Sequence, residues 1–150
     1  MIRGITLRLD DAIGFIINNT GRNLTLLLNK KFSQYGITTE QWTLLKRLDE
    51  QDGINIKELT QRVGKDQGNV TRILELLEKG GLVKRTPNPA DKRSSLVFLT
   101  EEGKGITENL IPIDEELHRN ALNGLSEEDL TVFKKVISKI NENIKKELEK

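Results

Sequence analysis

The stretch NPADKRSSLVFLT, Asn88 to Thr100, passes from charged and turn-forming residues into a β-rich run without charge. A second β-rich run, LVKRT, lies just before it at 82–86. Two such runs separated by turn residues are typical of a β-hairpin. We therefore expect a hairpin with Leu96, Phe98 or their neighbours facing the core and with the charged segment 91–93 at its tip.

Two short helices are predicted immediately before this hairpin. Asn55 followed by Glu58 has the pattern of a helix start, and Asp66 is a good N-cap for the next helix. Gly64 and Lys65 form the turn between them. Two short helices joined by a turn containing glycine make the helix-turn-helix pattern. A helix-turn-helix followed directly by a hairpin is a winged helix.

Further helices are expected on the N-terminal side. Apolar residues at spacings of three and four predict an amphipathic helix from about 10 to 35, with Gly36 as its left-handed cap. Thr38 with Gln41 then has the capping-box pattern that opens a second helix. The apolar face of this helix comprises Trp42, Leu45 and Leu48.

Two helices are expected after the hairpin. Thr100 can cap the first, which runs towards Asn120, and Pro112 predicts a kink or break in it near Leu110. Ser126 and Asp129 cap the second by the same spacing rule. Its apolar stripe consists of Leu130, Phe133, Val136, Ile137, Ile140, Ile144 and Leu148. The stripe packs either on its own chain or on a second subunit. We favour the subunit interface, because the outer helices carry more apolar surface than a compact core can cover.

Composition limits the classes of function. The 150 residues suit about one domain, and 35% hydrophobic with 31% charged residues suits a helix-rich soluble protein. Cysteine is absent and His118 is the only histidine, which excludes disulfides and thiol chemistry and makes a metal site improbable. No apolar run approaches about 18 residues and no leader is recognisable, so we expect a cytoplasmic protein without a membrane span.

Charge is distributed unevenly along the chain. Residues 56–100 carry nine Lys or Arg and five Asp or Glu, a net +4, whereas residues 101–150 carry eight and twelve, a net −4. A basic middle segment favours a polyanion-facing surface.

The segment DQGNVTR, 66–72, opens the second helix of the helix-turn-helix. Residues at the N-terminal end of such a recognition helix reach base edges in the major groove. Gln67, Asn69 and Arg72 can donate hydrogen bonds to bases or phosphates, and Gly68 allows close backbone approach. The same residues also suit an ordinary polar helix start on the surface.

The hairpin tip offers a cation within reach of DNA. Arginine gains from the negative potential of a narrow minor groove, and Asp91 can pin Arg93 through a charge-assisted hydrogen bond. A solvated turn is the alternative interpretation. The sequence contains no Gly-rich phosphate loop, Ser/His/Asp set or metal-spaced cluster. We therefore expect neither an enzyme nor a cofactor.

With these pieces in order, the chain resembles the multiple-antibiotic-resistance regulator (MarR) family of bacterial transcription factors. The likeness is strongest at 66–103, and its most specific motifs are NPADKR and LTEEG. It implies a mainly α fold with a small β wing, as a single MarR-type domain over 1–150. The winged helix-turn-helix DNA-binding part spans 37–100, and dimerisation helices span 5–32 and 105–150.

The resemblance also implies a function. Members of the family are homodimers that bind a pseudo-palindromic DNA operator, with repression relieved by small ligands, often anionic aromatics. The wing arginine of the family falls on Arg93 and its supporting aspartate on Asp91. The predicted DNA contacts are Gln67, Gly68, Asn69, Thr71, Arg72, Asp91, Lys92 and Arg93.

A ligand pocket is implied where the recognition helix meets the wing. Arg85 can pair with a carboxylate, Thr71 can add a hydroxyl, and Trp42 or Tyr35 can supply an aromatic wall. Arg85 is equally suited to contact a DNA phosphate or to cap a surface acid.

Two functions from different classes remain. The favoured one is a ligand-responsive DNA-binding regulator, expected to be a repressor. The alternative is a winged-helix protein-interaction module without sequence-specific DNA binding. Salt-dependent binding to its own promoter DNA distinguishes the two.

Overall fold

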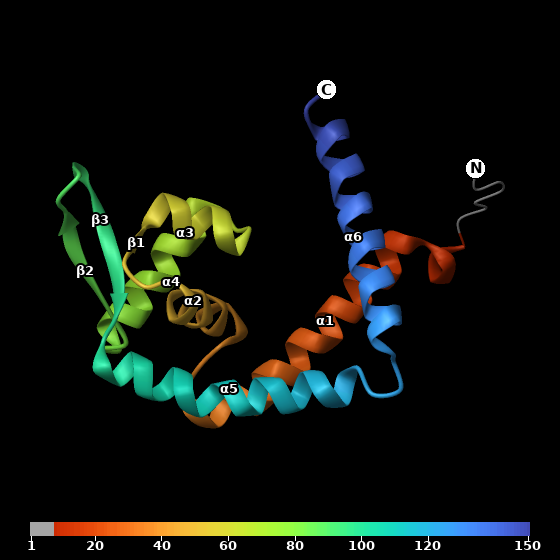
Figure 1. Cartoon of the computed structure of the whole chain (residues 1–150), viewed down its shortest axis with the longest axis horizontal. Helices are drawn as coiled ribbons and strands as arrows, with labels where there is room; N and C mark the ends of the chain where they lie inside the picture. The colour runs from red at the N-terminus through yellow and green to blue at the C-terminus, as the bar shows by residue number, and fades with distance from the viewer. Residues whose placement is uncertain (1–7) are drawn as a thin grey trace. The chain divides into compact units, whose positions relative to one another are not determined.

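The structure, a computed structural model, describes residues 8–150 and is mainly helical (Figure 1). The part of the predicted dimerisation segment at 5–7 lies outside the described residues. The helices are α1 Ile13–Phe32, α2 Thr39–Glu50, α3 Ile56–Val63, α4 Gln67–Lys79, α5 Glu101–Ala121 and α6 Glu127–Leu148, with 3-10 turns η1 Leu9–Asp11 and η2 Ser33–Tyr35. The strands are β1 Ile54–Asn55, β2 Val83–Asn88 and β3 Asp91–Leu99. The predicted fold class, mainly α with a small β wing, is confirmed.

Helix starts follow the predicted caps. The Thr38 hydroxyl accepts the Gln41 backbone N–H at 3.1 Å, and the Gln41 side chain accepts the Thr38 N–H at 3.0 Å. Asn55 and Asp66 cap α3 and α4 through bonds of 2.8 Å from backbone N–H groups three residues later. These bonds satisfy N–H groups that a helix leaves without an internal partner.

The sheet has one strand more than predicted. Its order is β1-β3-β2 and both pairings are antiparallel. Strand β1 is only two residues long, so it has no periodicity by which the sequence could reveal it. Val97 and Leu99 of β3 are buried, whereas the named candidates Leu96 and Phe98 are only partly buried, so it is their neighbours that face the core.

The charged segment 91–93 belongs to β3 and not to the turn itself. Asn88 pairs with Asp91 across the turn Pro89–Ala90, whereas the preceding residue, Pro87, pairs with Ser95. Residues 92–94 are thus extra residues on one strand, as in a bulge. The bulge carries the two cations of the tip, Lys92 and Arg93, outside the regular ladder.

Helix α5 continues through Pro112, so of the kink or break predicted near Leu110, the break is wrong. Proline removes one backbone hydrogen bond, but the turn before it is held by burial. Leu110 and Thr107 are fully buried, and the Thr107 hydroxyl donates to the Gly103 carbonyl at 2.7 Å. Packing therefore outweighs the local cost of the proline.

The core gathers the apolar faces of α2, α3 and α4 with the inner residues of the sheet. Phe32 of α1 packs on Trp42 of α2, with ring centroids 5.4 Å apart. Fully buried side chains of the core include Leu44, Leu45, Leu48, Leu59, Val70, Ile73, Leu74, Leu77 and Val97. The chain divides into two compact units after Asp114, and this core belongs to the first.

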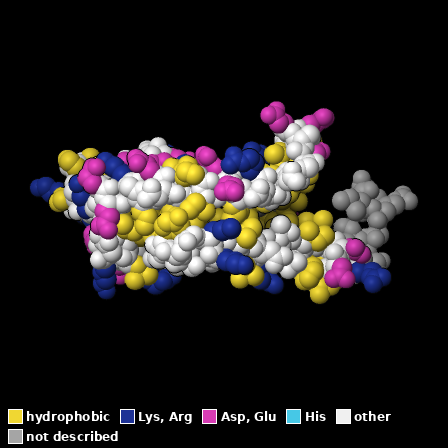
Figure 2. All heavy atoms as spheres, turned by 90° about the horizontal axis from the view of Figure 1, so that it is seen from below, with side chains coloured by type: hydrophobic (Ala, Val, Ile, Leu, Met, Phe, Trp, Pro, Cys, Tyr) yellow, Lys and Arg dark blue, Asp and Glu magenta, His cyan; other side chains and the backbone are white. Residues whose placement is uncertain are grey.

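The outer helices keep large apolar side chains at the surface. On α1 these include Ile13, Phe15, Ile16, Ile17, Leu26 and Leu27, and on α6 they include Val132, Phe133, Val136, Ile144 and Leu148. Figure 2 shows hydrophobic side chains reaching the surface between charged ones. None of the helices among residues 8–150 is long and apolar enough to cross a membrane.

Candidate nucleic-acid interface

The first turns of α4 present polar side chains because the opposite face of the helix is anchored in the core. Val70, Ile73, Leu74 and Leu77 are buried. Gln67, Gly68 and Arg72 are exposed, and Asn69 and Thr71 are partly buried. The predicted contact residues of this helix therefore share its accessible side.

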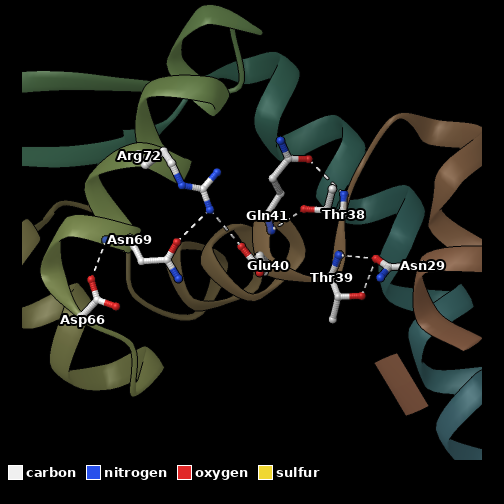
Figure 3. A network of polar contacts seen from close by, with 8 residues as sticks. All are labelled: Asn29, Thr38, Thr39, Glu40, Gln41, Asp66, Asn69 and Arg72. Carbon is white, nitrogen blue, oxygen red and sulfur yellow. Dashed lines mark hydrogen bonds and ion pairs between the residues drawn. The ribbon is translucent and has the colours of Figure 1, made fainter. Parts of the chain in front are cut away.

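Two of these residues, Asn69 and Arg72, are joined to each other, and Arg72 also contacts α2 (Figure 3). Nη2 of Arg72 donates to Oδ1 of Asn69 at 2.8 Å and lies 3.5 Å from Oε2 of Glu40. The sequence alone does not predict this contact of Glu40. It lies in the first turn of α2, where an acidic residue is already explained by the helix dipole, so no local signal marks it.

In the wing, the hairpin of β2 and β3, Asp91 hydrogen-bonds to the backbone of Arg93 and not to its guanidinium. Oδ1 of Asp91 accepts the backbone N–H of Arg93 at 3.0 Å. The Arg93 side chain is 95% exposed, and its Nε lies 3.7 Å from that oxygen, too far for a hydrogen bond. Asp91 therefore fixes the backbone of the wing and leaves the guanidinium reachable.

Residues of α4 and of the wing line one polar cleft of about 360 Å³. Gln67 and Arg93, 26 positions apart in the sequence, both line it, as do Lys57 at the start of α3 and Asp91. Lys57 was not among the predicted contacts, because a single lysine on an amphipathic helix is an ordinary surface residue. A second cleft, of about 280 Å³, lies between α1, α2 and α4 and includes Arg72 and Glu40.

The four residues predicted to bind a ligand lie in different elements and environments. Arg85 on β2 forms two bonds to Glu78 of α4, Nε to Oε2 at 3.3 Å and Nη2 to Oε1 at 3.0 Å. Trp42 is buried in the core, Tyr35 is exposed in η2 and Thr71 lies on α4. None of the four lines either cleft described above. Of the roles considered for Arg85, the one seen in the free chain is pairing with a surface acid.

Comparison with known proteins identifies the family. A sequence model described as the MarR family matches residues 37–95. The transcriptional regulator SarZ of Staphylococcus epidermidis is 32% identical over 117 residues, 78% of each chain. The multiple antibiotic resistance protein MarR of Escherichia coli is 30% identical over 129 residues, 85% of this chain and 90% of that protein. The chain belongs to the MarR family.

A solved structure adds the DNA complex. A mutant of the E. coli MarR protein complexed with operator DNA superposes with a TM-score of 0.81 at 28% identity, covering 91% of this chain and 99% of that one. The MarR-family chain is thus a winged-helix, DNA-binding transcriptional regulator. The matched relatives are regulators and not enzymes, which fits the expectation that this protein is not an enzyme.

Proposed function

We propose that this MarR-family protein is a ligand-responsive repressor that binds a pseudo-palindromic operator as a homodimer. The observation that carries the proposal is the cleft shared by Gln67 of α4 and Arg93 of the wing. A recognition helix reads the major groove, and an arginine beside it can enter the adjacent minor groove. The position of Lys57 in the same cleft adds a cation for the phosphate backbone.

Each predicted DNA contact has a role in this proposal. Gln67, Asn69 and Arg72 read base edges, while Gly68 and Thr71 allow backbone approach and phosphate contact. Arg93 and Lys92 neutralise the backbone or enter the minor groove, and Asp91 shapes the wing that carries them. The likeness to a protein solved with operator DNA supports these assignments.

Dimerisation is assigned to residues 5–32 and 105–150. The support for this assignment is the apolar surface that α1 and α6 keep exposed in the single chain. A two-fold dimer would place its two α4 helices in successive major grooves, about one helical turn apart. The operator would then be a pseudo-palindrome that mirrors the symmetry of the protein.

The ligand is proposed to be a small aromatic carboxylate that lowers operator affinity. Arg85 is the cation for its carboxylate, and Glu78 already holds that guanidinium in the free chain. The carboxylate of a ligand must therefore displace the Glu78 carboxylate from Arg85. Linkage requires that operator DNA weaken ligand binding by the same factor, commonly about 5- to 150-fold. Titration calorimetry with and without operator, repeated on Arg85→Ala, measures that factor, and equal affinities would exclude this ligand as an inducer.

DNA binding is tested with promoter DNA over a range of salt concentrations. Substitution of Arg72 or Asn69 by alanine should cost about 1–3 kcal/mol of base-specific affinity if a bidentate contact is lost. Lys79→Ala, at the other end of α4, is the control and should leave base selectivity unchanged. Retained affinity and selectivity in both test variants would remove α4 from the reading role. Absence of salt-dependent binding would favour the protein-interaction module instead.

A further inference from the structure

Glu40 makes a contact that the proposed function does not use. Its carboxylate oxygen Oε2 lies 3.5 Å from Nη2 of Arg72, 32 residues further along the chain. The same Nη2 donates to Oδ1 of Asn69 at 2.8 Å. Two of the three side chains that we assign to base reading are therefore joined to each other, and one of them, Arg72, also contacts a carboxylate on α2 in the free chain (Figure 3).

The backbone that carries Glu40 is held on both sides. Thr38 and Gln41 close the capping box around it. Between them, the backbone N–H and the hydroxyl of Thr39 both donate to Oδ1 of Asn29 on α1, at 2.8 and 2.7 Å. The start of α2 is thus fixed to α1, so Glu40 projects from a rigid position and the long Arg72 side chain reaches to it.

The contact with Glu40 occupies a donor that the guanidinium group needs for a bidentate bond to DNA. Arginine offers five N–H donors in a planar fork, and it recognises guanine or phosphate with two parallel bonds. One two-donor edge consists of Nη1 and Nη2, the other of Nε and Nη2. Both edges need Nη2, which already contacts Asn69 and Glu40. Neither edge is complete until one of these contacts opens, and the contact to Glu40 is the longer one.

We propose that Glu40 is an affinity- and specificity-determining residue, a built-in competitor for the DNA-reading guanidinium of Arg72. This inference rests on the proposed function. When Arg72 forms a bidentate base contact, Nη2 exchanges the Glu40 oxygen for a base acceptor and keeps its bond to Asn69. A non-specific complex offers no such base pair at that point, so Arg72 remains on Glu40. The competition therefore lowers affinity for the operator more than affinity for other DNA.

A simple charge effect gives a different result. A carboxylate near the phosphates repels every duplex to the same extent, so its removal strengthens binding to operator and non-operator DNA alike. The ratio of the two affinities separates competition from repulsion. Glu75, exposed on α4 itself, is the matched control because its removal takes one negative charge from the recognition helix.

The experiment uses a duplex that the wild-type full-length protein selects from a random pool, and a shuffled duplex of the same composition. Dissociation constants for both are measured for wild type, Glu40→Ala, Glu75→Ala, Arg72→Ala and the Glu40→Ala/Arg72→Ala double variant. We expect Glu40→Ala to raise the ratio of specific to non-specific affinity by about two- to fivefold, the size of an exposed ion pair. Glu75→Ala should leave the ratio unchanged. Adding Glu40→Ala to Arg72→Ala should also leave it unchanged.

Three results would overturn the inference. An unaltered ratio in Glu40→Ala would mean that the contact does not compete with DNA. A lowered ratio would mean that Glu40 orients Arg72 for reading. If Glu40→Ala changes the ratio by the same factor when Arg72 is also replaced by alanine, the effect of Glu40 comes from a partner other than Arg72. Failure of the wild-type protein to select any sequence would instead refute the proposed function, and this inference with it.

Discussion

Gly103 occupies a position where no side chain fits. A Cβ atom there would overlap the backbone carbonyl oxygen of Leu82, which already accepts the Thr100 N–H at 3.1 Å. The Thr100 hydroxyl in turn accepts the Gly103 N–H at 3.0 Å and donates to Gly81. The glycine of the LTEEG motif therefore lets α5 begin in direct contact with the end of the α4–β2 turn.

Gly103→Ala should destabilise the protein by about 1–3 kcal/mol, because backbone must move to admit the methyl group. Gly105→Ala is the control in the same helix, where a Cβ meets nothing within 4 Å. That variant should be stabilised by about 0.5–1 kcal/mol, since alanine favours the helix. Urea unfolding of both variants shows whether the free energy of unfolding falls in the first and rises in the second. A Gly103→Ala protein as stable as wild type would show that the contact relaxes freely.

Asp91 is expected to strengthen DNA binding although it is acidic. Its Oδ1 orders the wing by accepting the Arg93 N–H. Loss of that bond in Asp91→Ala should weaken operator binding by about 0.5–1.5 kcal/mol. Asp91→Asn keeps an acceptor oxygen and removes the charge, so it should bind at least as well as wild type. Fluorescence anisotropy measures all three proteins, and tighter binding by Asp91→Ala would show that charge repulsion outweighs ordering of the wing.

At the scale of single elements, the start of α6 carries a pH dependence. The pKa of Asp129 lies below its ordinary value. The main cause is the hydrogen bond that the carboxylate accepts from the backbone N–H of Ser126, and the smaller cause is a hydrogen bond with the Ser126 side chain. A lowered folded-state pKa contributes stability that is present above the unfolded pKa and is lost as the pH falls through the folded one. The capping box of α6 should therefore weaken in acid.

The variant Asp129→Asn should lose less thermal stability than wild type between pH 6 and pH 3, because it has no carboxylate to protonate at this cap. Glu128→Gln removes a charge from the same helical turn and serves as the control. Its pH profile should follow that of wild type. Melting curves followed by circular dichroism give the comparison, and identical profiles for Asp129→Asn and wild type would contradict the assignment.

At the scale of the whole molecule, the exposed apolar residues of α1 and α6 are predicted to pack against a second subunit. Phe133 is 61% exposed in the single chain. Contact of so large an apolar side chain with water is unfavourable in free energy. A dimer that buries both stripes should exceed the area of a transient interface.

Sedimentation at micromolar concentration should show a dimer for the wild type. Phe133→Glu should shift the protein towards monomer, because a charge would be buried at the interface. Lys135→Glu, at an exposed polar position of the same helix, should remain dimeric. A stable folded wild-type monomer would refute the dimer, and a dimeric Phe133→Glu protein would move the interface elsewhere.

The sequence by itself determined the helix starts and the winged-helix order. Thr38 with Gln41 and Ser126 with Asp129 are hydrogen-bonded pairs three residues apart, so chain geometry alone brings each pair together. The same holds for the glycine at position 36, whose φ of 69° closes η2. The order of helices and β-rich runs, together with the motifs NPADKR and LTEEG, was sufficient to recognise the family.

Only the tertiary structure decided which distant residues meet. Ile54 pairs with Val97 to add a third strand, and Gln67 shares a cleft with Arg93. Burial of Leu110 lets α5 continue past a proline that local rules would make a break. The contact of Glu40 with Arg72 joins helices whose packing no local pattern encodes. Such contacts depend on how whole apolar faces fit together, and that fit is set by the summed burial of many side chains rather than by spacing along the chain.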